Sequence, residues 1–366
     1  MQITDENQSE QCRRARLSRD ARFDGSFFIA VKSTGIFCRP VCPARSPAEK
    51  NVLYYSQAVT AMQAGYRPCL RCRPDSAPFS AAWCGTDTSL FRAQRLLSEL
   101  PPQPVSRIAE RMGITPRYLH KLFTARLGAS PKVFQQSQQL LFAKQLLQQS
   151  SLPVTDIALA AGFDSARQLQ RQMQRYWSLT PSAVRGRSST GNSAQAISIK
   201  LTLNYRPPYN WPAVRDFLKK RLVACIEDVT EHSYVRHFRY EQCEGKLKAT
   251  HKPQHNGFEV VITLSHVEFL HTVVSNLTRV LDLNADPAQI ELALIQAGMP
   301  QAELTSGLRL PGAWSPFEAA VRAILGQQVS VVAAIRLLNK FCDYFYAHTG
   351  IQSFPLPEDV MNDDLT

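Results

Sequence analysis

Four cysteines in the first quarter of the chain place the strongest constraint on its fold. Three residues lie between Cys38 and Cys42, two between Cys69 and Cys72, and 26 between the two pairs. Two close pairs separated by a loop are the usual way to build a tetrahedral thiolate site for zinc. We therefore predict that these four cysteines ligate one Zn²⁺. From the spacing alone, a purely structural zinc is the more common use of such a site.

The rest of the composition agrees with a folded protein of the cytoplasm. The 366 residues are 44% hydrophobic, which suits two to four domains with real cores. The polar N-terminus has no signal-peptide core and no run of 18 apolar residues occurs, so we expect a cytoplasmic, nucleoid-associated protein without a membrane partner. The remaining cysteines lack metal-site spacing and are expected to be packing or surface residues; they are Cys12, Cys84, Cys225, Cys243 and Cys342.

Positive charge is concentrated in the first half of the chain. Residues 1–190 contain 26 Lys and Arg against 12 Asp and Glu, whereas residues 191–366 contain 16 against 18. A basic half of this kind favours an anionic polymer through counterion release and electrostatic steering. A charge that only keeps the protein soluble is the alternative interpretation.

Turn and linker residues suggest how the chain is divided. We expect a multidomain α+β protein with a small zinc-binding α/β domain at 1–78 and an all-α domain at 85–187. The Ser- and Gly-rich stretch 186–193 marks a linker, which we place at 188–196. Alternating segments at 197–205, 246–251 and 257–264 predict strands in a β-rich domain at 197–306. Helical periodicity returns at 315–347, within an incomplete helical domain at 307–366.

The all-α domain contains an internal repeat. Ile108-Ala109 and Gly113 recur 49 residues later as Ile157-Ala158 and Gly162. A small residue followed four positions later by glycine in the turn lets two helices cross closely, as a helix-turn-helix requires. The two copies are joined by a helix predicted from Pro131 to Gln149.

Each copy predicts one recognition helix, the first starting near Thr115 and the second near Asp164 or Ser165. Their outward side chains are of types that reach base edges or phosphates. The alternative is a plain helical bundle with a solvated basic face. The side chains predicted to contact DNA are Arg117, His120 and Lys121 in the first copy and Arg167, Gln168 and Arg171 in the second.

Residues 20–76 closely resemble the N-terminal domain of the Ada family. The resemblance is carried by Phe23-Asp24-Gly25, by TGIFCRPVCPAR at 34–45 and by AGYRPCLRCRPD at 64–75. It implies a domain that repairs methylphosphotriesters in DNA, with the first cysteine of the motif, here Cys38, both ligating zinc and accepting the methyl group. The spacing alone does not choose between Cys38 and Cys69.

This resemblance implies a methylphosphotriester-DNA–protein-cysteine methyltransferase that acts once. Zinc keeps Cys38 as the thiolate, which attacks the methyl carbon. Methylation reduces the negative charge of the site, so DNA affinity should rise and repair should switch on a transcriptional activator. We expect the damaged backbone to be held by Thr34, Arg45, Arg67 and Arg71, for which solvated surface side chains are the alternative. The partners implied are double-stranded DNA and RNA polymerase, with the protein a monomer.

The two later parts also resemble known families. The all-α domain is similar to AraC-type double helix-turn-helix domains, although Leu169 and Ser178 stand where that family usually has Phe and Gly. GLRLPG at 307–312 and FEAAVRAILGQQVS at 317–330 resemble AlkA-type 3-methyladenine DNA glycosylases. That resemblance implies that Gln328 fills the gap left by a flipped base; a helix-surface glutamine is the alternative.

Two enzymatic activities of these families are not expected in this chain. The Pro-Cys-His-Arg motif of O6-methylguanine transfer does not occur. The sequence stops before a helix-hairpin-helix and its aspartate, so glycosylase activity is not expected, and apolar faces at Ile324, Leu325, Leu337 and Phe341 should be exposed. The alternatives to the repair switch are a base-excision glycosylase regulated by the Ada-like part, and a transcription factor whose zinc is only structural.

Overall fold

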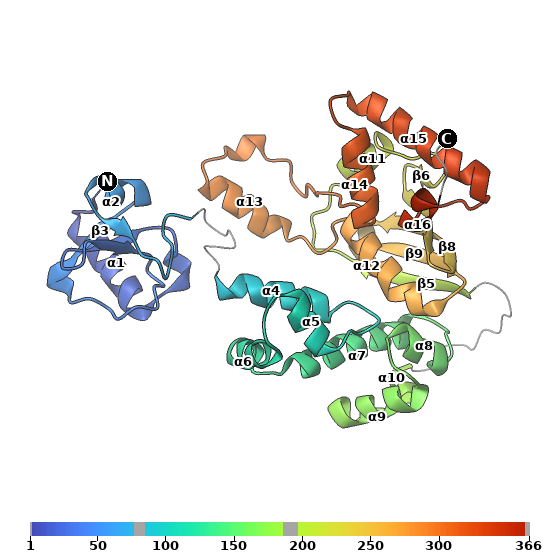
Figure 1. The fold of residues 1–366 in the computed structure, drawn as a ribbon, viewed down its shortest axis with the longest axis horizontal. Coiled ribbons are helices and arrows are strands. Elements are labelled where there is room, and N and C mark those ends of the chain that lie inside the picture. The colour runs from blue at the N-terminus through green and yellow to red at the C-terminus, as the bar shows by residue number, and fades with distance from the viewer. Residues whose placement is uncertain (1, 77–84, 186–196, 363–366) are drawn as a thin grey trace. The chain divides into compact units, whose positions relative to one another are not determined.

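The computed structural model describes residues 2–76, 85–185 and 197–362, which form two compact units. The first comprises Met1–Leu96 and Ser106–Gly128, and the second Leu97–Val105 and Ala129–Thr366 (Figure 1). The expected all-α domain at 85–187 contributes to both units: residues 85–96 and 106–128 belong to the first, and residues 97–105 and 129–185 to the second. The predicted linker, Cys84, and the tail from residue 363 lie outside the described residues.

A four-stranded sheet forms the frame of the cysteine-rich part of the first unit. Its strand order is β3-β1-β2-β4; β1 pairs antiparallel with β2 and β3, and β4 pairs parallel with β2. Gly35, at φ 65°, makes the tight turn between β1 and β2, a conformation that glycine adopts without strain. The strands are β1 (Phe28–Val31), β2 (Ile36–Cys38), β3 (Val52–Tyr55) and β4 (Arg67–Pro68).

Short helices cover both faces of this sheet. On one face α1 buries Cys12 and Ala15 in a cluster with Ile29 and Tyr54. On the other, Ala61 of α2 is buried in a separate cluster with the remaining inward residues of the strands. The helices are α1 (Glu6–Ser18) and α2 (Ala58–Gln63), with 3-10 turns η1 (Ala21–Phe23) and η2 (Glu49–Asn51).

The first copy of the repeat consists of helices joined by turns. The side-chain oxygen of Thr115 accepts the backbone N–H of Tyr118 at 3.2 Å and so caps the helix that Pro116 begins. This confirms the predicted start of the first recognition helix. The helices are α4 (Thr86–Leu97), α5 (Val105–Arg111) and α6 (Pro116–Leu127).

The second copy lies in the second unit and follows the same plan. Ser165 caps its recognition helix, and Gly162 turns the chain at φ 72°. A Cβ at Gly162 would lie 2.6 Å from Cδ of Pro102, so this glycine is required for space as well as for conformation. The helices are α7 (Pro131–Gln149), with the predicted bounds, α8 (Val154–Ala160), α9 (Ala166–Trp177) and α10 (Pro181–Arg185).

A five-stranded antiparallel sheet of order β5-β9-β8-β7-β6 organises the rest of the second unit. The predicted strands are present, β9 with the predicted bounds. Their inward residues share one core with α11, which lies between β5 and β6, and α12, which follows β9; neither helix was predicted. The elements are β5 (Ile197–Asn204), α11 (Trp211–Lys219), β6 (Glu227–Val229), β7 (Ser233–Tyr240), β8 (Cys243–Lys252), η3 (Pro253–His255), β9 (Gly257–Leu264), η4 (Val267–Phe269) and α12 (Leu270–Val280).

The last described elements are helical. Ile324 and Leu337 are exposed as predicted, but Leu325 and Phe341 were wrongly expected to be so, because both pack against a small core around Leu338. None of the described helices is long and apolar enough to cross a bilayer. These elements are α13 (Pro287–Gln296), η5 (Gln301–Glu303), α14 (Pro316–Leu325), α15 (Val331–Thr349) and α16 (Pro357–Met361). The multidomain α+β prediction is confirmed.

Candidate metal centre and nucleic-acid interface

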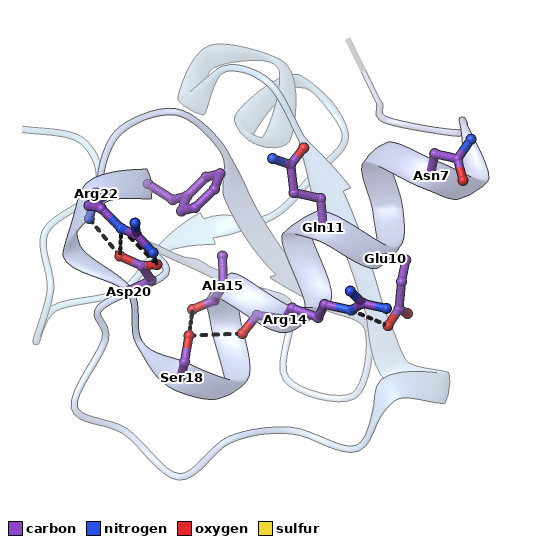
Figure 2. Close-up of a pocket in the computed structure, with 9 residues that line it drawn as sticks. Asn7, Glu10, Gln11, Arg14, Ala15, Ser18, Asp20 and Arg22 are labelled. Carbon is purple, nitrogen blue, oxygen red and sulfur yellow. Dashed lines mark hydrogen bonds and ion pairs between the residues drawn. The ribbon is translucent and has the colours of Figure 1, made fainter.

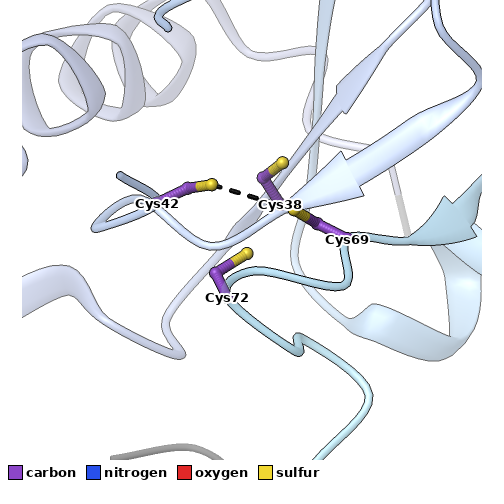
Figure 3. A group of neighbouring side chains, drawn as sticks. All are labelled: Cys38, Cys42, Cys69 and Cys72. Atoms are coloured by element: carbon purple, nitrogen blue, oxygen red, sulfur yellow. Dashed lines mark hydrogen bonds between the residues drawn. The ribbon is translucent and has the colours of Figure 1, made fainter. Parts of the chain in front are cut away.

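The parallel pairing of β2 with β4 brings the two cysteine pairs together. Phe37 lies opposite Pro68, so Cys38, at the end of β2, and Cys69, directly after β4, leave the sheet at the same edge. After each of the two strands the polypeptide turns and supplies a second thiol, Cys42 after β2 and Cys72 after β4. All four Sγ atoms lie within 4.8 Å of one another, and those of Cys42 and Cys69 are 3.9 Å apart (Figure 3).

This geometry fits a tetrahedral divalent cation. Zn–S bonds of about 2.3 Å in a tetrahedron place the sulfurs about 3.8 Å apart, close to the observed separation. The backbone N–H of Arg39 donates to Sγ of Cys72 at 3.4 Å, as expected around a thiolate. The donor set and its spacing are therefore those of a four-cysteine zinc site.

The thiols influence one another's ionisation. Hydrogen bonds from Cys38 and Cys72 lower the pKa of Cys42 to about 2, and the same contact with Cys42 raises the pKa of Cys38. Negative charge on one sulfur therefore opposes charge on the next. Four thiolates at these separations require a cation among them.

The four sulfurs differ in their access to solvent. Cys42, Cys69 and Cys72 are at most 9% exposed, whereas Cys38 is only partly buried. Cys38, Cys42 and Cys69 all line a cavity of about 730 Å³. Of the two cysteines between which the spacing could not choose, Cys38 is partly exposed and Cys69 is 7% exposed.

Two of the four residues predicted to hold the damaged backbone line this cavity. Thr34 and Arg45, both exposed, lie on its rim near Cys38. Arg67 and Arg71 are also exposed but are not among its lining residues. Sequence reasoning missed the lining residues Arg16, in α1, and Arg19, its C-cap, because their contacts with the rim come from folding and leave no local motif.

The predicted recognition residues lie on the exposed sides of their helices. Arg117, His120 and Lys121 are exposed at spacings of three and four residues on α6, where they share one face. Arg167 and Arg171 are likewise exposed on α9, and together with Arg175 they line an open groove along that helix. Both faces are suited to an anionic surface.

The Gln168 side chain is less available for a contact with DNA than predicted. Its side-chain oxygen accepts the backbone N–H of Asp164 at 2.7 Å, and its own backbone N–H donates to the hydroxyl of Ser165. This reciprocal arrangement resembles a capping box, so the carbonyl oxygen of the Gln168 amide is committed to the helix start. The Ser-x-x-Gln spacing could have signalled this role.

Gln328 occupies an unusual backbone position. It is exposed in the turn between α14 and α15 at φ 58°, the left-handed region that is strained for a side chain other than that of glycine. Ser330 then caps α15 through the N–H of Ala333. The turn therefore holds Gln328 at a defined place on the surface.

Family descriptions match successive parts of the chain. The metal binding domain of Ada matches residues 11–75, a helix-turn-helix domain matches 108–187, and the AlkA N-terminal domain matches 200–315. The fold and the thiolate cluster thus define an Ada-type metal-binding domain joined to a helix-turn-helix domain and an AlkA-type N-terminal domain. In this order of parts the chain is similar to the Ada family, with a region similar to the AlkA N-terminal domain after the helix-turn-helix.

Individual relatives match different shares of the chain. The chain is 36% identical to the probable bifunctional transcriptional activator/DNA repair enzyme AlkA of Mycobacterium tuberculosis, over 89% of this chain and 66% of that protein. It is 36% identical to the bifunctional transcriptional activator/DNA repair enzyme Ada of Escherichia coli, over 46% of this chain and 47% of that protein. The chain therefore spans from about half to just under two thirds of these relatives.

A solved structure also matches the cysteine-rich part. The refined structure of the DNA methyl phosphotriester repair domain of E. coli Ada is 49% identical, with a TM-score of 0.18. The match covers 19% of this chain and 75% of that one.

Proposed function

We propose that this protein transfers the methyl group of a DNA methylphosphotriester irreversibly to Cys38 and thereby becomes a sequence-specific transcriptional activator. The observation that carries the proposal is the placement of Cys38. It is the partly exposed member of a four-thiol cluster, on the wall of a cavity rimmed by Thr34 and Arg45. The relatives named for transcriptional activation and DNA repair support the same function.

The chemistry follows from the donor set. Zn²⁺, held by Cys38, Cys42, Cys69 and Cys72, would keep the sulfur of Cys38 as thiolate near neutral pH. The Cys38 sulfur donates an electron pair to the methyl carbon while the methyl C–O bond breaks, and the electron pair of that bond leaves on the phosphodiester oxygen. The product is a thioether on Cys38 and a normal phosphodiester. A thioether resists hydrolysis, so each molecule would act once.

The basic side chains around Cys38 would orient the substrate. A methylated phosphotriester is locally neutral, whereas the phosphates on either side are anionic. Arg45 and Thr34 line the cavity, and in this proposal Arg45 would bind a flanking phosphate and Thr34 would donate a hydrogen bond. We propose Arg67 and Arg71, which lie outside the cavity, as contacts to more distant phosphates.

Methylation would switch DNA affinity through charge. Four thiolates around one divalent cation carry two negative charges, and methylation of one sulfur removes one of them. At an effective dielectric constant of ~20–80 and a few ångströms, one charge is worth about 1–4 kcal/mol. Reduced repulsion of the backbone would then let α6 and α9 bind a promoter, where RNA polymerase is the partner of an activator.

The exposed faces of α6 and α9, together with Gln328, supply the further DNA contacts of this proposal. Arg117, His120 and Lys121 on α6 and Arg167 and Arg171 on α9 would reach base edges or phosphates, with Gln168 contributing only its amide N–H groups. Gln328, held at the α14–α15 turn, would contact DNA as a gap-filling side chain in the AlkA-like part.

The test is intact-protein mass spectrometry after incubation with methylphosphotriester duplex, followed by peptide mapping. We expect a gain of one methyl group, located on Cys38, and tighter promoter binding. Cys38→Ala should take up no methyl, while Cys225→Ala, outside the cluster, should be methylated normally. No mass gain in folded, zinc-loaded wild-type protein would refute the transferase and leave a regulator with structural zinc.

A further inference from the structure

Arg16 is a buried arginine that lines the same cavity as Cys38, which is called the methyl-acceptor cavity below. Its side chain is 5% exposed although it belongs to a helix on the surface of the small domain. A buried guanidinium is costly unless hydrogen bonds and an opposite charge satisfy it. The contacts that satisfy Arg16 therefore indicate what the residue holds in place.

Those contacts all lie 30 or more residues away along the chain. The Nη1 atom donates to Oγ of Ser46 at 2.6 Å and to the carbonyl oxygen of Pro47 at 3.1 Å. The Nε atom donates to the hydroxyl of Tyr54 at 3.3 Å, and Nη2 pairs with the carboxylate of Glu49. Tyr54 donates in turn to Glu49 at 2.8 Å, which closes the network.

The network ends on the rim segment of the cavity, residues 44–48. This segment has no helix or strand and carries Arg45, a cation that lines the same cavity as Cys38. Arg19, one helical turn beyond Arg16, donates to the carbonyl oxygen of Ala44 at 3.0 Å. Arg16 of α1 and Arg19, its C-cap residue, therefore hold the rim on both sides of Arg45.

We infer that Arg16 is a positioning residue that fixes the rim segment, and with it Arg45, relative to the Cys38 sulfur. The inference rests on the proposed methyl transfer. In-line attack requires the methyl carbon about 3–3.5 Å from the sulfur, and a misplacement of 1 Å can cost about 100-fold in rate. A rim without regular hydrogen bonding reaches that precision only if side chains immobilise it.

Another arginine of α1 provides the matched control. Arg14 lies on the other side of the helix, where it pairs with Glu10 one turn earlier and borders a shallow groove that also contains Asp20 and Arg22 (Figure 2). Its side chain is 80% exposed and does not line the methyl-acceptor cavity. Arg14→Met removes the same charge from the same helix and leaves the rim contacts intact.

The experiment measures single-turnover methyl transfer on the full, zinc-loaded chain as a function of DNA concentration. For Arg16→Met we expect the saturating rate to fall about 10- to 100-fold, with the half-saturating DNA concentration changed less than 3-fold and one zinc retained. Arg16→Lys, which keeps the pairing with Glu49 but not every rim contact, should recover part of the rate. Arg14→Met should match wild type.

Amide hydrogen exchange of residues 44–48 supplies a readout independent of activity. Exchange there should accelerate in Arg16→Met while β1 and β2 remain as protected as in wild type. An unchanged rate and unchanged exchange would overturn the positioning role, as would loss of zinc or general unfolding, which would make Arg16 merely structural. An inactive wild type would refute the proposed function, and the exchange result would still decide whether Arg16 orders the rim.

Discussion

Removing one charge from the buried ionic cluster of the second unit should destabilise that unit strongly. Arg236 of β7 and Glu318 of α14 pair with side chains only 2% exposed, and Glu227 and Arg322 complete the cluster. The cluster balances two positive against two negative charges. Glu318→Gln leaves one uncompensated positive charge in a site that water hardly reaches.

The expected magnitude follows from this burial. Breaking a buried pair by removing one partner costs about 3–5 kcal/mol. We take about 3 kcal/mol, because Glu227 still pairs with Arg236 and Arg322 keeps some solvent contact. For a unit of this size, that corresponds to a fall in Tm of about 6–12 °C.

The assay is thermal unfolding followed by tryptophan fluorescence. Trp314 reports locally, because the guanidinium of Arg236 lies 4.7 Å from the centre of its ring. Glu303→Gln, at an exposed site, is the matched control and should leave the Tm unchanged. The double variant Glu318→Gln/Arg322→Met restores charge balance and should recover part of the loss. A Tm for Glu318→Gln within about 1 °C of wild type would refute the reasoning.

The pH dependence of this effect has a definite sign. Burial opposes ionisation of Glu318, but Arg236 and Arg322 outweigh it and hold the pKa below its usual value of 4.5. A carboxylate with a lowered folded-state pKa stabilises the protein above its unfolded pKa, and this contribution is lost as pH falls through the folded pKa. The deficit of Glu318→Gln should therefore be full at pH 7 and shrink below about pH 4.

Three further outcomes are expected. Burial lowers the pKa of His271 to about 4, so the unfolded chain takes up a proton between about pH 6.5 and 4 that the folded chain does not. The free energy of unfolding, measured by urea denaturation, should therefore fall by about 2 kcal/mol over that range. This fall should be absent in His271→Phe. Gly162→Ala should lower the Tm more than Gly113→Ala, because both glycines have φ near 70° but a Cβ at Gly113 meets no atom within 4 Å; equal effects would contradict the steric argument. Chelation of the metal should unfold the small domain, seen as rapid proteolysis within residues 34–75, while α7 stays protected; a chelator-resistant domain would show that the four cysteines do not need a metal.

Much of the helical architecture could be predicted because its signals are local. The caps at Thr115 and Ser165, the turn glycines and the periodicity of α7 all depend on residues within a few positions of one another. The short strands β1–β4 were not predicted individually. Each has two to four residues, and β1 is buried on both faces, so the alternation that marks a half-exposed strand does not occur.

For the candidate site, the spacing of the cysteines predicted the metal ligands, whereas only the tertiary structure shows which residues surround them. Spacing identifies Cys38, Cys42, Cys69 and Cys72, since two close pairs suffice to surround a cation wherever the sheet places them. How far each cysteine is exposed in the cavity depends on how β2, β4 and the rim segment pack, and the sequence alone expresses none of that packing. Arg16 is the clearest case: nothing near it in sequence distinguishes it from Arg14, and only contacts 30 to 38 residues distant make one arginine part of the site and leave the other in solvent.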